Sequence, residues 1–305
     1  EELRCELKTP ERQMQTFKGE EGIMTSQWRI YAEAARYLEE GRAPLRLCLQ
    51  ASAGTGESFL LETLFLWAIL NGHSVKAAAP IGIAAARLRM PRTPLSATTL
   101  HYLFGLSIDG ESKIDVDNPA DEGFKRIAEM TLLIVDEASM IDDCTWHQVR
   151  DQLSSLGAKA ASLNIIGKHP DQDFFGRAHI IVAMDLKQLP PATSNPPFIA
   201  RDPEFQRVFE FRVLRQNRRL AAGSNEEEQQ ALDTFHGVLE DVAHGKATPR
   251  VREALIAAYV RGAQQNQETV GFEHSTACVA TRRYRDRWNG NVLTLLGNTL
   301  AKHNV

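Results

Sequence analysis

The sequence has little that would place it in a membrane or cross-link it. No stretch of about 18 uncharged apolar residues is present, so we expect no membrane span. The four cysteines, at positions 5, 48, 144 and 278, are scattered without a CxxC pair. This pattern favours neither a disulfide framework nor a zinc site, and it fits a reducing compartment. The N-terminal residues show no signal-peptide pattern.

Net charge is also small, at −4 over 305 residues, which argues against a protein that coats nucleic acid by bulk charge. Basic clusters exist locally: residues 201–220 hold six arginines against three acids, and residues 281–289 hold four against one. A solvated surface is the alternative interpretation of either run. With 43% hydrophobic and 24% charged residues, the composition is that of a globular protein rather than a disordered chain or a coiled-coil rod.

Short apolar segments alternate with helical patterns along the chain. We expect strands at 45–50, 75–79, 131–135 and 179–184, and helices that begin near residue 25 and at residue 59. Glycines or acids follow these strands. The alternation predicts an α/β fold with a mostly parallel sheet and a functional site at the carboxyl edge of that sheet.

The segment ASAGTGES at residues 51–58 lies between an expected strand and an expected helix, as a phosphate-binding loop of the type GxxxxGK[ST] does. In such a loop, backbone N–H groups hold the phosphates, a lysine neutralises them and a hydroxyl binds Mg²⁺. Two positions depart from the pattern, because Ala51 replaces the first glycine and Glu57 replaces the lysine. The octet predicts ATP and Mg²⁺ as ligands, with Ser58 on the metal. The other predicted nucleotide-binding residues are Ser52, Ala53, Gly54, Thr55, Gly56 and Glu57.

The glutamate at position 57 changes the local charge by two units relative to lysine. One unit-charge interaction at about 4 Å and an effective dielectric near 20 amounts to roughly 4 kcal/mol, so nucleotide binding is expected to weaken by orders of magnitude. A Mg²⁺ ion that bridges Glu57 to a phosphate would soften this effect. The alanine at position 51 matters only if that position needs a positive φ.

Two further segments carry residues that suit phosphoryl transfer. The strand LLIV at 132–135 ends in Asp136, which would hold Mg²⁺, and Glu137, which would orient or deprotonate the attacking water. A helix-capping pair is the alternative for these two acids. In MDLKQLPP at 184–191, Gln188 would contact the γ-phosphate or the attacking water, although Pro-Pro after a strand also suits a rigid loop.

In this order the motifs resemble the PIF (petite integration frequency) family of superfamily 1B DNA helicases, which is related to RecD. The resemblance runs from about residue 24 to residue 289. Residues 25–27 are similar to the family's Q motif, in which Gln27 would read adenine. Residues 214–219 are similar to its LxxNxR segment, in which Arg219 would contact the γ-phosphate. Residues 134–140 and 184–191 match its IIDEISM and GDFxQLPP motifs, with Met184 in place of the glycine.

Two more segments resemble elements of the family that touch the DNA strand. These are APIGIAA at 79–85, where Ile81 replaces a threonine, and ATTLHYLFG at 97–105. The resemblance implies DNA contacts by Pro80, Gly82, Thr98, Thr99 and His101. Without the family context, His101 would be a core or surface histidine. The histidines at 73, 147, 179 and 274 lack metal-ligand spacing, so we expect no structural metal.

The resemblance implies a P-loop fold of two RecA-like domains, with ATP between them and single-stranded DNA or duplex junctions as partner. We expect a tail at 1–20, a first domain at 21–212 with a small 1B-type insertion at 106–129, and the start of a truncated second domain at 213–305. The implied activity is ATP hydrolysis coupled to 5′-to-3′ translocation and duplex unwinding in repair, recombination or telomere maintenance. The implied location is intracellular: nucleus, mitochondrion or cytoplasm.

The departures at Ala51 and Glu57 and the lack of the family's later motifs count against motor activity of the chain as it stands. A translocating motor needs two lobes that open and close around the nucleotide. Two alternatives therefore stay open. One is a non-catalytic relative that binds single-stranded DNA or a protein. The other is a decayed copy without function.

Overall fold

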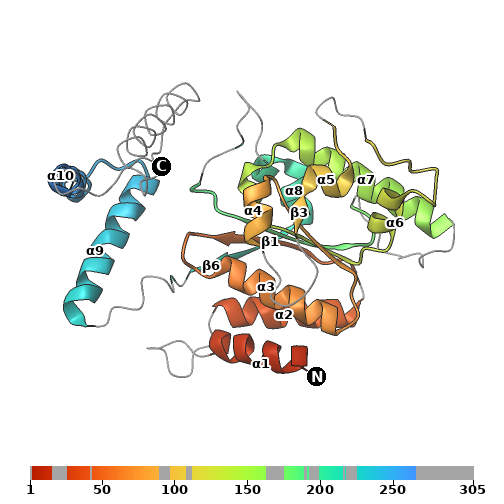
Figure 1. Cartoon of the computed structure of the whole chain (residues 1–305), viewed down its shortest axis with the longest axis horizontal. Coiled ribbons are helices and arrows are strands. Elements are labelled where there is room, and N and C mark those ends of the chain that lie inside the picture. The colour runs from red at the N-terminus through yellow and green to blue at the C-terminus, as the bar shows by residue number, and fades with distance from the viewer. Residues whose placement is uncertain are drawn as a thin grey trace, which may run out of the picture. The chain divides into compact units, whose positions relative to one another are not determined.

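The computed structural model (Figure 1) describes residues 2–15, 26–41, 43–88, 97–107, 112–162, 175–188, 191, 199–215, 217 and 225–265. The chain divides into two compact units, Glu1–Gln229 and Gln230–Val305. Each is described by itself. No helix among the described residues is long and apolar enough to cross a membrane.

A six-stranded sheet forms the centre of the first unit, in the order β3-β2-β4-β5-β1-β6. Every pair of neighbouring strands is parallel, which confirms the expected sheet. Parallel pairing brings all the carboxyl ends of the strands to one edge. The strands are β1 (Arg46–Ala51), β2 (Val75–Ala79), β3 (Thr98–Thr99), β4 (Leu132–Val135), β5 (His179–Met184) and β6 (Glu210–Leu214).

Two hydrophobic cores cover the two faces of this sheet, because successive side chains of a strand point to opposite faces. Within β4, Leu132 and Ile134 belong to one core and Leu133 and Val135 to the other. The first core includes side chains of α1 (Glu2–Gln15), α2 (Ser26–Glu40), α3 (Glu57–Leu70) and α4 (Gly82–Arg87). The second includes side chains of α5 (Leu100–Phe104), α6 (Glu122–Ala128), α7 (Asp143–Ser162) and α8 (Pro203–Val208). Short 3₁₀ turns, η1 (Ala138–Met140) and η2 (Ile199–Arg201), follow β4 and precede α8.

The N-terminal segment corrects the expectation of a tail at residues 1–20. Residues 2–15 form α1, and Met14 at its end is fully buried in the first core. Glu11 accepts a hydrogen bond of 2.5 Å from the Tyr31 hydroxyl on α2. The sequence of α1 is strongly polar and contains Pro10, and the helix makes contacts with α2 and α3.

The first unit extends beyond the expected boundary at residue 212. β6 pairs with β1 through Leu214 and Ala51, so the first unit continues past residue 212 and ends at Gln229. In the described part of the expected insertion at 106–129, Ile114 and Phe124 are buried in the second core, and its assignment as a 1B-type insertion stays a prediction. In the second unit, the described residues form α9 (Glu226–Ala243), which begins at the end of the first unit, a connection at 244–248 and α10 (Pro249–Gln265). The assignment of this region to a second RecA-like domain stays a prediction.

Candidate active site

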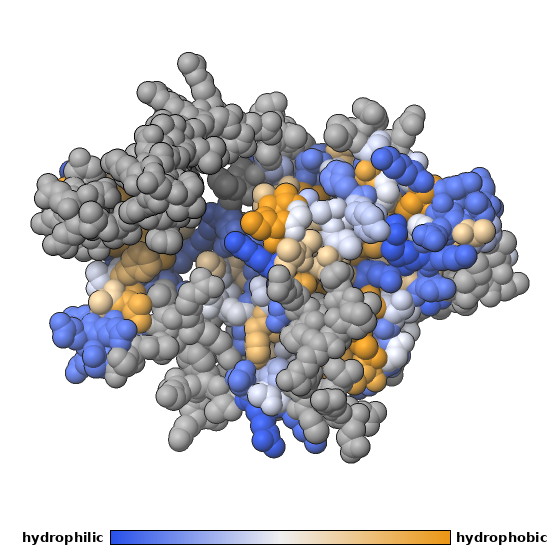
Figure 2. Space-filling model, viewed as in Figure 1, coloured by the Kyte–Doolittle hydropathy of each residue, from blue (hydrophilic) through white to orange (hydrophobic). Residues whose placement is uncertain are grey.

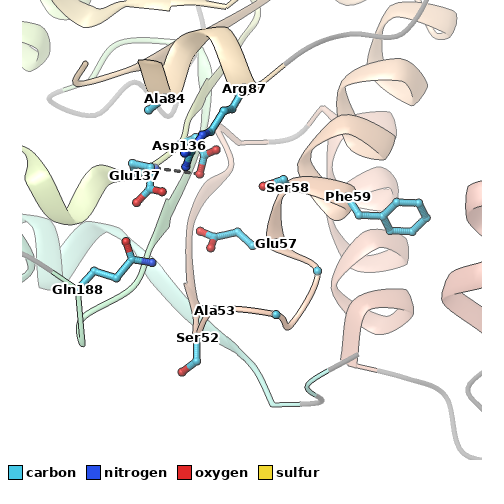
Figure 3. Close-up of a pocket in the computed structure, with 12 residues that line it drawn as sticks. Ser52, Ala53, Glu57, Ser58, Phe59, Ala84, Arg87, Asp136, Glu137 and Gln188 are labelled. Atoms are coloured by element: carbon cyan, nitrogen blue, oxygen red, sulfur yellow. Dashed lines mark hydrogen bonds between the residues drawn. The ribbon is translucent and has the colours of Figure 1, made fainter. Parts of the chain in front are cut away.

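A cavity of about 650 Å³ lies at the carboxyl edge of the sheet. Figure 3 shows the residues that line it, which come from the loop after β1, the start of α3, the end of α4 and the segments after β4 and β5. Elements far apart in sequence therefore meet here because parallel strands end at one edge. The lining residues are Ser52, Ala53, Gly54, Gly56, Glu57, Ser58, Phe59, Ala84, Arg87, Asp136, Glu137 and Gln188.

The loop after β1 has the backbone that a phosphate-binding loop needs. Gly54 and Gly56 adopt φ angles of 87° and 78°, a region that suits glycine. Thr55 closes the turn, because its N–H and its hydroxyl both donate to the Ser52 carbonyl, at 3.1 Å and 2.8 Å. Ala51 is the last residue of β1 and has no positive φ. The replacement of the first glycine by Ala51 therefore puts no strain on this backbone.

Gln27 of α2 lies directly behind this loop. Its side-chain amide donates to the carbonyls of Thr55 and Gly56, at 2.8 Å and 3.1 Å, and only 1% of the residue is exposed. A Cβ at position 56 would lie 2.1 Å from the Gln27 amide nitrogen, so a side chain there would displace the Gln27 amide from the loop, in addition to the strain of the positive φ. Gln27 thus holds the loop in place, and its predicted contact with adenine stays a prediction.

Glu57 occupies the lysine position as the first residue of α3, and its side chain extends into the cavity in Figure 3. Its Oε1 atom is buried and has no hydrogen-bond partner. Burial, together with the charges of Asp136, Glu137 and Asp185, raises the pKa of Glu57 to about 9.

This pKa corrects the expected charge change of two units. At pH 7 a carboxyl group with a pKa of about 9 is mainly protonated, so Glu57 is neutral. Relative to a lysine, the site loses one attraction of roughly 4 kcal/mol but gains no full negative charge. The lost attraction weakens nucleotide binding, whereas a neutral Glu57 largely avoids the expected repulsion between this side chain and the phosphates.

Asp136 and Glu137 follow β4 and face the loop across the cavity (Figure 3). The Glu137 N–H donates to Asp136 Oδ1 at 2.9 Å. Burial raises the pKa of Asp136 to about 6. The hydrogen bond from the Glu137 N–H lowers this pKa, and the negative charge of Glu137 raises it further. Glu137 has a φ of 53°, the one positive φ among the described non-glycine residues. Such backbone strain is frequent at functional sites.

Gln188 and Asn217 complete the edge of the site. Gln188 is exposed, and its amide donates to Asp185 Oδ2 at 3.2 Å, so Asp185 positions it at the cavity. Asp185 also accepts the Lys187 N–H at 3.0 Å. From the segment after β6, the Asn217 side chain donates to the Ala53 carbonyl of the loop at 3.1 Å. Arg219, predicted to contact the γ-phosphate, lies outside the described residues.

The residues predicted to contact DNA gather at the β2–β3 edge of the sheet. Ala78 and Ala79 pair with Thr98 and Thr99, which brings the 80–82 turn next to the 98–101 segment. Pro80, Gly82 and His101 are at least partly exposed, whereas the Thr99 hydroxyl accepts the Tyr102 N–H and caps α5.

Large apolar side chains are exposed beside these residues, and Figure 2 shows the hydrophobic surface over α4. Ile83 is 64% exposed and Tyr102 is 65% exposed. The Arg126 guanidinium lies over the Tyr102 ring, 5.2 Å from its centre. An exposed aromatic ring with a neighbouring basic group suits base stacking.

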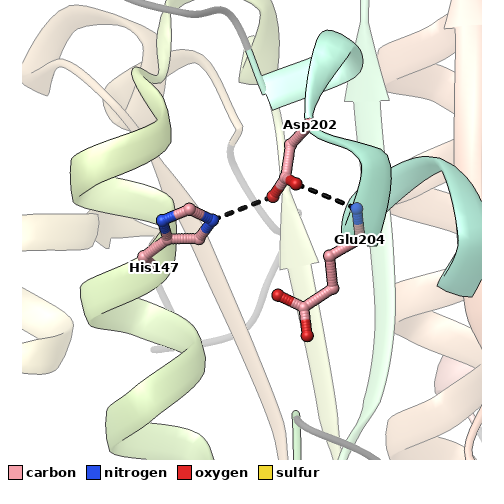
Figure 4. A group of neighbouring side chains, drawn as sticks. All are labelled: His147, Asp202 and Glu204. Atoms are coloured by element: carbon pink, nitrogen blue, oxygen red, sulfur yellow. Dashed lines mark hydrogen bonds and ion pairs between the residues drawn. The ribbon is translucent and has the colours of Figure 1, made fainter.

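The structure also brings together one group of possible metal ligands that sequence spacing did not indicate. Ligand atoms of His147, Asp202 and Glu204 lie within 4.8 Å of one another (Figure 4). Each already has a protein partner: His147 Nε2 is 2.9 Å from Asp202 Oδ2, Asp202 Oδ1 accepts the Glu204 N–H, and Glu204 pairs with Arg150. These contacts join α7 to the start of α8, and this structural role accounts for the cluster without a metal ion.

The donor set at the cavity fits Mg²⁺. Ser58 offers a hydroxyl oxygen, Asp136 offers carboxylate oxygens, and both line the same space. Hard oxygen ligands of this type suit Mg²⁺, which keeps several water molecules and binds through one or two carboxylates together with phosphate oxygens.

Comparison with known proteins agrees with this arrangement. The family model of the PIF1-like helicases matches residues 23–253. The chain belongs to the PIF1-like helicase family. This confirms the resemblance drawn from the motifs, and the α/β sheet confirms the expected RecA-like fold. A comparison with curated protein sequences gives no match.

Solved structures share the fold of this PIF1-like chain at low sequence identity. A Pif1 helicase from a study of unwinding at forked double-stranded DNA by two coordinating copies is 21% identical, with a TM-score of 0.52, over 74% of this chain and 49% of that one. Bacteroides Pif1 bound to single-stranded DNA is 21% identical, with a TM-score of 0.50, over 74% and 47%. The chain thus spans about half the length of these relatives.

Among the polar residues of this site, three were not singled out from the sequence. They are Arg87, Asp185 and Asn217. Asp185 and Asn217 lie inside motifs that the resemblance covers, so those motifs could have pointed to them. Arg87 lies in an alanine-rich helix, and nothing in its local sequence indicates the cavity.

Proposed function

We propose that this PIF1-like chain carries the ATP-binding first lobe of a DNA helicase. In this role it binds Mg·ATP at the cavity and single-stranded DNA at the β2–β3 edge. As one of the two lobes that a motor needs, it takes part in coupling hydrolysis to 5′-to-3′ movement and unwinding. The observation that carries the proposal is the placement of Asp136, Glu137 and Gln188 across one cavity from a glycine-bearing loop at a helix N-terminus. Family members in solved structures act on forked or single-stranded DNA.

Each described group has a task in this proposal. The N–H groups of the loop and of the first turn of α3 hold the phosphates. Ser58 and Asp136 hold Mg²⁺, which when bound neutralises the phosphate oxygens. Glu137 orients the attacking water and accepts its proton, and Gln188, positioned by Asp185, contacts the water or the γ-phosphate. The neutral Glu57 carboxyl weakens binding because it provides no positive charge.

By the same resemblance, we extend the proposal to a role in DNA repair, recombination or telomere maintenance. The corresponding location is inside the cell, in the nucleus, the mitochondrion or the cytoplasm. Exposed Ile83 and Tyr102, with the half-buried Arg126 against the Tyr102 ring, lie next to the predicted DNA contacts and support single-stranded DNA as the partner.

The test compares the native chain with Glu57→Lys and Glu57→Gln in Mg·ATP binding and in hydrolysis stimulated by single-stranded DNA. We expect weak binding by the native chain and by Glu57→Gln, which keeps a neutral side chain of the same size. Glu57→Lys should bind ATP about 10²–10³-fold more tightly, as one restored attraction of roughly 4 kcal/mol allows. If Glu57→Lys neither binds nor hydrolyses ATP, the nucleotide site is not functional and the proposal fails.

A second candidate function is a non-catalytic module that binds single-stranded DNA, and the glutamate at the lysine position favours it. Such a module would bind DNA with the same affinity in the presence and absence of ATP. Its affinity would fall as salt rises, because released counterions drive phosphate contacts. DNA binding that changes with Mg·ATP would count against this candidate.

A further inference from the structure

The charges that line the cavity are unbalanced for a ligand made of phosphates. Glu57, Asp136 and Glu137 carry carboxyl groups, and the loop lacks its lysine. Among the lining residues, Arg87 alone carries a guanidinium or ammonium group. A triphosphate that entered this cavity would therefore find one positively charged side chain on its walls.

Arg87 is placed to reach such a ligand from the wall opposite the loop. It is the last residue of α4. Ala84, one turn earlier in the same helix, also lines the cavity. In Figure 3 the Arg87 side chain extends from α4 toward the region of Asp136. Arg87 follows β2 and Asp136 follows β4. Because β2 and β4 are neighbouring parallel strands, the segments that carry Arg87 and Asp136 leave the sheet side by side.

The backbone that carries Arg87 is fixed, whereas its side chain is exposed. Ala84, Ala85 and Leu88 bury one face of α4 in the first core. The helix is closed by hydrogen bonds from the Ala85 N–H to the Ile81 carbonyl and from the Leu88 N–H to the Ala84 carbonyl, at 3.0 Å and 3.2 Å. None of the ion pairs among the described residues includes Arg87, so the cavity acids do not occupy it.

We propose that Arg87 supplies the positive charge that the phosphate loop lacks, by binding the terminal phosphates of a nucleoside triphosphate from the opposite wall. This inference rests on the proposed function, because it requires nucleotide at the same site. A guanidinium has five donors in a planar fork and forms paired hydrogen bonds with phosphate oxygens. Arginine at a helix C-terminus also interacts favourably with the helix dipole, and that structural role alone would leave nucleotide binding unchanged when Arg87 is removed.

The experiment measures competition of ATP and ADP, each with Mg²⁺, against a fluorescent ATP analogue for Arg87→Ala, Arg87→Lys and the native chain. The matched control is Arg36→Ala, because Arg36 is exposed on α2, and its ion pair in the described part of the chain is an i,i+4 pair with Glu40. We expect Arg87→Ala to weaken ATP binding at least tenfold and ADP binding by less than threefold. Arg87→Lys should recover part of the loss. Equal ATP affinity for Arg87→Ala and Arg36→Ala would overturn the inference.

A second set of variants separates this inference from the proposed function. In the Glu57→Lys background, where the lysine returns, removal of Arg87 should cost less than it does in the native chain, since two cations then share one task. If the native chain shows no measurable binding, the same comparison is made in the Glu57→Lys background, where a loss below twofold overturns the role of Arg87. If Glu57→Lys also fails to bind ATP, the proposed function and this inference both fall.

Binding of single-stranded DNA without nucleotide is the final readout, because DNA phosphates offer the same chemistry as nucleotide phosphates. Arg87→Ala should leave this affinity within twofold of the Arg36→Ala value. A variant that loses DNA affinity but keeps ATP affinity would assign Arg87 to the DNA strand and overturn the inference.

Discussion

Glu137 shows how a single residue combines strain with chemistry. Its φ of 53° lies in the left-handed region, where a side chain with a Cβ costs roughly 1–2 kcal/mol. The turn η1 begins directly after it, and Ala138 and Ser139 in that turn are buried, so the surrounding fold imposes this conformation. The position therefore stores strain in a residue that we assign to the attacking water.

We predict that Glu137→Gly unfolds at a higher urea concentration than Glu137→Ala. Both variants remove the carboxylate from the acidic cluster, but only glycine relieves the backbone, so the difference should be about 1 kcal/mol. The measurement is equilibrium unfolding in urea. Both variants should also lose DNA-stimulated ATP hydrolysis. Equal stability of the two variants would show that the positive φ carries no strain.

Gln27 and Glu57 show which properties of single residues the sequence could not predict. A short motif around Gln27 was recognisable in the sequence. Its hydrogen-bond partners, Thr55 and Gly56, lie 28 and 29 positions further along the chain, so no local sequence pattern could indicate them. The charge state of Glu57 likewise depends on Asp136, Glu137 and Asp185, which the fold brings together. The sequence therefore named most of the site residues, whereas their mutual effects required the structure.

At the scale of elements, buried strands were the most predictable parts. β2 and β5 lie where their apolar runs indicated, at Val75–Ala79 and His179–Met184, because both strands are covered on the two faces of the sheet. The helix α1 was missed because its sequence is polar and contains Pro10. Met14 and the Glu11–Tyr31 hydrogen bond stabilise it through tertiary contacts, which periodicity cannot show.

The second unit contains an electrostatic contact between two helices. Asp241 of α9 accepts hydrogen bonds from Arg250 of α10 at 2.5 Å and from the Thr248 hydroxyl at 2.7 Å. These contacts, with Arg250 as the largest, lower the pKa of Asp241 from 3.8 to about 2. Because the folded pKa lies below the unfolded one, the contact stabilises the folded state above pH 3.8. That stabilisation is lost as the pH falls toward 2.

We predict that the Asp241 carboxyl titrates near pH 2 in the native chain, as followed by its NMR carboxyl resonance. In Arg250→Ala its pKa should rise toward 3.8 without reaching it, because the Thr248 hydroxyl still donates to the carboxylate. Arg252→Ala is the matched control, because Arg252 is exposed on the same helix and should leave the titration unchanged. An unshifted Asp241 in Arg250→Ala would mean that the guanidinium does not hold this carboxylate.

For the first unit as a whole, one sheet is shared by two cores. Alternate residues of the same strands enter opposite cores, so neither face can lose its packing without disturbing the strands that carry the site. Leu61 on α3 is buried in the first core and Phe205 on α8 in the second, and both are fully covered. Each core also contains a tryptophan, Trp67 in the first and Trp146 in the second.

We predict that Leu61→Ala and Phe205→Ala each destabilise the whole first unit, by about 2–5 and about 3–5 kcal/mol, because each leaves a cavity in a close-packed core. Leu186→Ala is the control, since Leu186 is 40% exposed and its truncation should change stability by less than about 0.5 kcal/mol. The measurement is amide hydrogen exchange of α3 and of α7, which lie on opposite faces. Because the sheet couples the faces, either core variant should lower protection in both helices. Loss confined to the helix on the mutated face would show that the two cores unfold separately.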